Sequence, residues 1–74
     1  MTKDELIFRM ETLQPLEFTY KGKLYNMTFD KVGDGTIRIR FGRVFEEQTY
    51  SSFGELMNTA KIDNHFFKDM LDIL

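Results

Sequence analysis

The sequence predicts an α+β domain in which a three- or four-stranded antiparallel meander is packed on one face by helices. Two stretches near the middle of the chain alternate apolar and polar residues, as half-buried strands do. Segments before and after them carry apolar residues at helical spacing. The chain has 74 residues, the size of a single small globular domain spanning 1–74. The predicted order is α-β-β-β-(β)-α-α.

The composition supports a folded domain and excludes several kinds of site. Charged residues make up 30% of the chain and hydrophobic residues 42%, a balance typical of globular proteins. There is no cysteine, which excludes disulfides, thiolate zinc sites and cysteine nucleophiles. His65 is the single histidine, which excludes a site with several histidine ligands. Eight Phe and three Tyr supply the large apolar side chains that a small core needs.

The net charge of −2 argues mildly against a free-standing DNA-binding domain, because such domains are usually basic. The charge is unevenly distributed. Residues 16–43 hold six cations and three anions, whereas residues 44–74 hold two cations and six anions. No segment is long and apolar enough to span a membrane, and the charged N-terminus does not resemble a signal peptide. We therefore expect a cytoplasmic protein with no membrane partner.

The first predicted helix covers residues 3–13. Thr2 and Glu5 have the spacing of a capping box, in which the hydroxyl accepts a hydrogen bond from an early helical N–H. Pro15 disfavours helical geometry at the residue before it, so the helix should stop near Leu13. The apolar stripe of this helix consists of Leu6, Ile7, Met10 and Leu13.

The first two strands are predicted at 16–21 and 24–30. Gly22-Lys23 between them fits a two-residue type II′ turn, in which glycine supplies the positive φ. All the large apolar side chains then lie on one face of the sheet. The predicted pairs are Leu16 with Phe29, Phe18 with Met27, and Tyr20 with Tyr25.

The third strand follows Gly33-Asp34-Gly35, which we interpret as a three-residue hairpin loop ending in a left-handed glycine. A shorter turn would place apolar side chains opposite polar ones and break the apolar face. The longer loop makes 24–32 the central strand and pairs Phe29 with Ile39 and Met27 with Phe41. The predicted central core face consists of Tyr25, Met27, Phe29, Ile39 and Phe41.

Residues 43–50 leave two alternatives open: they continue the sheet or form a short fourth strand. Ser52 and Glu55 form a second capping box, which should open a helix at Phe53. After a break at 61–63, Asp63 or Asn64 should cap a last helix. That helix would carry Phe66, Phe67, Met70, Leu71 and Leu74.

The polar residues predict neither an enzyme nor a metal or cofactor site. His65 has no serine or threonine that can be placed beside it, as general-base catalysis requires. Ser52 is accounted for as a helix cap and lacks the flanking glycines of a nucleophile elbow. Glu46 and Glu47 are adjacent and would point to opposite faces of a strand, so they do not converge on one ion.

We predict instead a non-catalytic protein-interaction or regulatory module. Several apolar side chains do not fit the stripes that build the core, and some follow Gly42, where the third strand should end or bulge. Exposed strand edges with apolar side chains favour association with another chain. The partner would be another protein or a second copy, giving a homodimer. The predicted surface consists of Phe8, Val44 and Phe45, with Glu46 and Glu47 as its polar rim.

A nucleic-acid-associated module is the alternative. Arg38 and Arg40 alternate on the third strand and share its outer face, where they could bind phosphate together with Arg43. The register also places Asp30 beside Arg38 and Glu17 in the row of Arg40. Cross-strand ion pairs are therefore the first expectation for these two arginines, and phosphate binding is the second.

Overall fold

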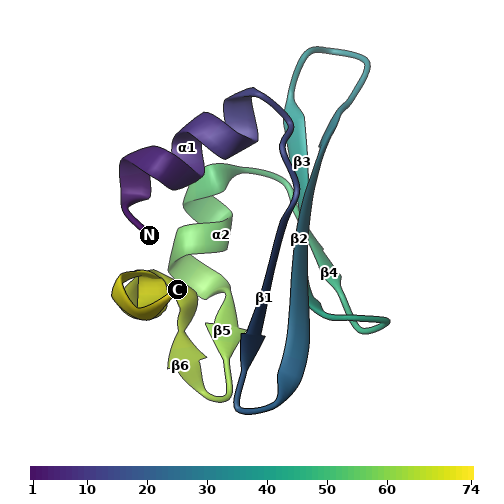
Figure 1. The fold of residues 1–74 in the computed structure, drawn as a ribbon. Helices are drawn as coiled ribbons and strands as arrows, with labels where there is room; N and C mark the ends of the chain where they lie inside the picture. Colours follow the sequence, from purple (N-terminus) through teal and green to yellow (C-terminus); the bar gives the residue numbers. More distant parts are fainter.

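The computed structural model describes residues 1–74 and confirms the predicted α+β fold (Figure 1). Four antiparallel strands form a sheet in the order β1-β2-β3-β4, and a separate two-stranded hairpin pairs β5 with β6. The elements are α1 (Lys3–Glu11), β1 (Leu16–Tyr20), β2 (Lys23–Lys31), β3 (Ile37–Arg43), β4 (Gln48–Tyr50), α2 (Phe53–Thr59), β5 (Lys61–Ile62), β6 (His65–Phe66) and the 3₁₀ helix η1 (Phe67–Ile73).

Two layers enclose the core. In Figure 1 the helices α1 and α2 and the C-terminal turn lie on one side of the four-stranded sheet, and nothing covers its other face. We call these the inner and the outer face. Fourteen buried residues, all hydrophobic, form one cluster, and the five residues of the predicted core face are among them. None of the helices is both long and apolar enough to cross a membrane.

Both predicted N-caps are present, but neither glutamate side chain makes the return bond that completes a capping box. The Thr2 hydroxyl accepts a hydrogen bond from the Glu5 N–H at 3.1 Å, and the Ser52 hydroxyl accepts one from the Glu55 N–H at 3.1 Å. Helix α1 ends at Glu11, two residues earlier than predicted. Leu13 has already left helical geometry, with a positive φ of 56°, before Pro15 is reached.

The register between β1 and β2 differs from the prediction by two residues. Phe18 lies opposite Tyr25, and the turn is Lys21-Gly22 instead of Gly22-Lys23. Both turn residues have positive φ, as in a type I′ turn. Because side chains alternate with a period of two, a two-residue shift keeps every apolar side chain on the inner face, and the apolar pattern could not distinguish the two registers. The shift lets the rings of Phe18 and Tyr25 stack at 5.5 Å.

The register between β2 and β3 is the predicted one. Phe29 pairs with Ile39 and Met27 with Phe41. The three-residue loop is closed by a hydrogen bond from the Val32 N–H to the Thr36 carbonyl at 2.8 Å, and Gly35 has a positive φ of 90°. Of the two alternatives for residues 43–50, the structure shows the second, because Gln48–Tyr50 forms a fourth strand beside β3.

The predicted last helix is wrong in its first turn. Asp63 and Asn64 do not cap a helix but form the turn of the β5–β6 hairpin, each with a positive φ. Asp and Asn tolerate left-handed geometry better than most residues, so the same side chains suit both a cap and a hairpin turn. His65 therefore lies in β6 and not at a helix start, and the 3₁₀ helix begins at Phe67.

An ion pair joins this hairpin to the main sheet. The Lys21 ammonium lies 3.1 Å from the Asp63 carboxylate, so the β1–β2 turn and the β5–β6 turn are in contact. The hydrogen bond to Lys21 lowers the pKa of Asp63, and the same hydrogen bond raises the pKa of Lys21. Both side chains are exposed, so we expect this pair to position the hairpin more than to stabilise the fold.

Phe29 tests the central register. Its side chain is buried between β1–β3 and the helical layer, so Phe29→Ala should lower the free energy of unfolding by about 3–5 kcal/mol. That is a large share of the total stability of about 5–15 kcal/mol typical of a folded domain, so the variant should unfold by 37 °C. Chemical denaturation measures the change, with Phe8→Ala on the exposed side of α1 as the control. Equal stability of the two variants would contradict the register.

Candidate functional site

Two adjoining surfaces of the molecule carry candidate sites, and the loop between β3 and β4 contributes to both. One surface is the uncovered outer face of the sheet. The other is a cleft between the inner face and the α2–β5 segment. The residues predicted from sequence are distributed over these surfaces and over α1.

The outer face presents Arg38 and Arg40 side by side along β3. Their cross-strand neighbours are Asp30 and Thr28, as the sequence predicted. The predicted ion pairs are nevertheless absent, because no carboxylate lies within 4 Å of either guanidinium and the two ion pairs of the protein lie elsewhere. Glu17 lies opposite Asn26 instead of in the row of Arg40, as a consequence of the β1–β2 shift. Both arginines are exposed and free to bind a partner.

Arg43 does not join this pair. It lies opposite the inward-facing Tyr25, so strand alternation places it on the inner face, away from Arg38 and Arg40. Its guanidinium is 3.8 Å from the Glu46 carboxylate. The three arginines predicted to contact nucleic acid are therefore divided between two faces of the sheet.

An apolar patch lies at the end of the outer face where β3 leaves the sheet. The Val44 N–H donates a hydrogen bond to the Leu24 carbonyl at 3.1 Å, which extends the β2–β3 ladder by one step and sets Val44 opposite Leu24. Leu24 is 44% exposed. Phe45 follows at the tip of the loop. We call Leu24, Val44 and Phe45 the apolar corner.

Phe45 is the most unusual residue of the corner. It is 96% exposed, and its φ of 73° lies in the left-handed region that aromatic residues rarely adopt. The turn that holds it is closed by a hydrogen bond from the Glu46 N–H to the Arg43 carbonyl at 2.8 Å. The fold thus accepts both backbone strain and an exposed aromatic ring at one position, without burying any of that ring in return.

Gly42 makes this loop possible. Its φ is 154°, and a Cβ built on it would lie 2.9 Å from both the Glu46 carbonyl oxygen and the Glu47 Cα. The chain therefore folds back directly over the glycine after leaving β3. This reversal places Phe45 at the tip and brings Glu46 beside Arg43.

The predicted partner surface is only partly brought together. Val44 and Phe45 are neighbours, but Phe8 lies on α1 in the helical layer, far from the β3–β4 loop at the lower right of Figure 1. Glu46 turns toward Arg43, whereas Glu47 is half-buried. Sequence reasoning missed Leu24. The available signal was that Leu24 is the single large apolar residue among the outward-facing positions of its strand.

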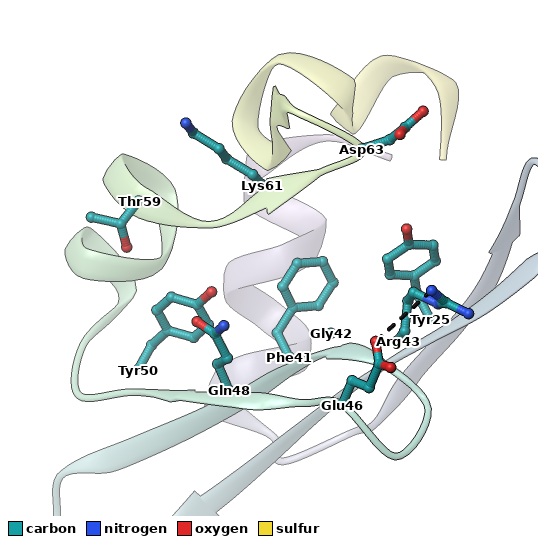
Figure 2. Close-up of a pocket in the computed structure, with 10 residues that line it drawn as sticks. All are labelled: Tyr25, Phe41, Gly42, Arg43, Glu46, Gln48, Tyr50, Thr59, Lys61 and Asp63. Carbon is teal, nitrogen blue, oxygen red and sulfur yellow. Dashed lines mark ion pairs between the residues drawn. The ribbon is translucent and has the colours of Figure 1, made fainter.

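The second surface is a cleft of about 380 Å³ where the helical layer leaves the sheet uncovered (Figure 2). Strands β2, β3 and β4 provide one wall, and α2 with β5 provides the other. Only three of its ten lining residues are hydrophobic. The lining consists of Tyr25, Phe41, Gly42, Arg43, Glu46, Gln48, Tyr50, Thr59, Lys61 and Asp63.

Two tyrosines anchor this cleft. Tyr25 is 6% exposed and Tyr50 is 9% exposed, so their rings belong to the core. Neither hydroxyl takes part in any of the side-chain hydrogen bonds of the protein. No buried polar atom lacks a partner, so both hydroxyls are open to solvent at the cleft. Burial raises the pKa of the Tyr50 hydroxyl, and the charge of Glu55 raises it further.

The polar groups of both surfaces are suited to binding. No three His, Cys, Asp or Glu side chains are grouped as metal ligands would be. His65 is exposed in β6, beside a shallow hollow lined by Tyr20, Phe66 and Met70. The corner offers apolar surface, and the cleft offers hydroxyl, amide and guanidinium groups.

No protein-family model matches this chain, and no curated protein or solved structure is significantly similar to it. Its function is therefore inferred from the two surfaces alone.

Gly42→Ala tests the packing of the loop on which both surfaces depend. The added methyl would collide with backbone atoms of Glu46 and Glu47, which cannot rotate away, so we expect a loss of about 1–3 kcal/mol in the free energy of unfolding. Gly33→Ala is the matched control, because its Cβ would meet nothing within 4 Å. Thermal denaturation of both variants measures the difference, and equal stabilities would show that the loop does not pack on Gly42.

Proposed function

We propose that this protein is a non-catalytic protein-interaction module and that the apolar corner is its contact surface. The observation that carries the proposal is Phe45, which combines left-handed backbone geometry with almost complete exposure. Strained residues concentrate at functional sites, where the gain is made in a complex and not in the free protein. Exposed apolar clusters on a polar face are typical of interfaces.

The outer face around the corner supplies the rest of an interface. A stable contact buries about 800 Å² on each partner, which the corner alone does not provide. The uncovered face next to it contributes Asn26, Thr28 and Arg40, a polar surround of the kind that borders apolar interface centres. The partner on this surface is a second copy of the chain or another protein, and it would bury Leu24 and Phe45 together.

Phe45→Asn separates the binding role from the folding role. Asparagine tolerates left-handed geometry, so the variant should be more stable than the wild type by roughly 1 kcal/mol. In a domain of this size that raises Tm by about 4–8 °C. The same variant should lose association, measured as solution mass by light scattering and as retention of a partner on the immobilised protein.

Phe8→Gln is the matched control, since it removes another exposed phenylalanine from α1, away from the corner. It should leave association unchanged. The corner is not an interaction surface if the wild type is monomeric and retains the same proteins as Phe45→Asn. A loss of stability in Phe45→Asn would instead assign Phe45 to the fold.

Nucleic-acid binding is a second candidate because Arg38 and Arg40 are exposed and unpaired on an open sheet face. Arginines in this state can contact phosphate, and such contacts release counterions, so binding would weaken steeply with salt.

The test is retention on immobilised DNA and RNA at low salt. The double variant Arg38→Gln with Arg40→Gln should lose retention while keeping its stability, because neither side chain is engaged in the fold. Lys3→Gln with Lys68→Gln removes the same number of exposed charges from the helical layer and serves as the control. A wild type that elutes with the unbound fraction at low salt excludes this candidate.

A further inference from the structure

The cleft next to β4 has features that neither the fold nor the interaction surface explains. It lies on the inner face, whereas Leu24 lies on the outer face, and its lining does not include Phe45. Its volume of about 380 Å³ falls within the range of sites that take small ligands or single side chains of a partner. Residues from β2, β3, β4, α2 and β5 converge there, so the folded chain holds the site in place.

The two tyrosine hydroxyls point to a ligand that accepts or donates hydrogen bonds. Their rings are more than nine-tenths buried and hold the hydroxyls rigidly, yet no protein group is bonded to either one. Tyr50 and Gln48 are two positions apart on β4, opposite the inward-facing Ile39 and Phe41, and both line the cleft in Figure 2. The Gln48 amide also has no side-chain hydrogen bond within the protein. The two tyrosine hydroxyls are carried by buried rings, so these donors lose little entropy when a ligand binds.

Arg43 supplies a charge for an anionic group. Arg43 makes a single ion pair, with Glu46, at a distance of 3.8 Å. Both side chains of the pair are exposed, so most N–H donors of the guanidinium remain free. A guanidinium binds a carboxylate best through two parallel N–H···O bonds, which the Glu46 contact does not provide. A ligand carboxylate can therefore replace Glu46 as the partner of Arg43 with little loss of interaction energy.

The charged residues that line the cleft are two cations and two carboxylates, and both carboxylates already have cationic partners. The Lys61 ammonium is turned away from the cleft and lies 5.1 Å from the centre of the Phe66 ring. The Asp63 carboxylate is paired with Lys21 at 3.1 Å, which weakens its repulsion of an anionic ligand. The charge of Lys23 also lowers the pKa of Asp63. Arg43 is thus the cation that faces the cleft, and a ligand carboxylate would compete with Glu46 for it.

We propose that this cleft binds a carboxylate ligand, with Arg43 as the charged anchor at one end and Gln48 and Tyr50 as neutral donors farther along the sheet. The carboxylate comes from a glutamate or aspartate side chain of a peptide or from a small free dicarboxylate. The three aromatic residues of the floor, Tyr25, Phe41 and Tyr50, would contact the aliphatic part that bears it. This site shares no residue with the apolar corner.

The test is a titration of the folded protein followed by ¹H–¹⁵N NMR. The probes are glutarate and a blocked tripeptide with a central glutamate, and the matched control is the same tripeptide with a central glutamine. Saturable shifts at Gln48 and Tyr50, with a Kd on the order of 1 mM, are expected for at least one carboxylate probe. Binding of the tripeptide alone assigns the site to peptides, and binding of glutarate alone assigns it to free acids.

Arg43→Gln should lower the affinity for the probe roughly tenfold, the loss expected for one charge-assisted contact. Arg40→Gln, two positions earlier on β3 but on the outer face, should leave affinity unchanged. Phe45→Asn should also bind normally, which keeps this result separate from that of the interaction surface. Equal binding of the glutamine tripeptide, equal effects of the two arginine variants, or no saturable shift with either carboxylate would each overturn the proposal.

Discussion

The pairing of β2 with β3 is the interaction on which the rest of the structure depends. Its register sets Phe29 against Ile39 and Met27 against Phe41, and thereby decides which side of the sheet the helices cover. The same register places Arg40 on the open face and Arg43 beside Tyr25. A one-residue slip would exchange these positions and expose the core. Core burial and the separation of two surfaces are therefore consequences of one ladder.

A single chain reversal after that ladder serves both surfaces. The backbone of Glu46 and Glu47 packs directly on Gly42, which only a residue without a side chain permits. The reversal lifts Phe45 away from the domain and directs Glu46 back to Arg43. The position of Phe45 on one side of the loop and that of Glu46 on the other thus depend on the same few backbone torsions. A partner that moves the loop would alter the setting of Arg43.

Much of the fold could be predicted because local signals agreed with one another. Alternation and the loop at Gly35 both required the β2–β3 register, and Ser52 with Glu55 marked the start of α2. The β1–β2 register failed because a two-residue shift leaves the apolar faces unchanged. The β5–β6 hairpin failed because Asp63 suits a helix cap as well as a left-handed turn.

The candidate sites were less predictable, since they depend on distance in space. Val44 and Phe45 could be identified because they fall outside the apolar stripes, but Phe8 satisfied the same criterion and lies in the other layer. The cleft brings Tyr25 together with residues as distant in sequence as Asp63. No periodicity in the sequence predicts that these residues lie together. Their proximity arises only when the last third of the chain folds back over the sheet.

That last third has a consequence for how the protein forms during synthesis. The ring of Phe67 packs against Phe41 at 4.8 Å, and Met70 and Leu71 are buried beside it. The meander is complete at Tyr50, but part of its inner face stays exposed until η1 packs against it. While η1 is still inside the ribosome, the emerging sheet presents apolar side chains to solvent. The segment from Ser51 to Ile73 that completes this face is added within seconds, since ribosomes add about 5–20 residues each second, and that speed limits the exposure.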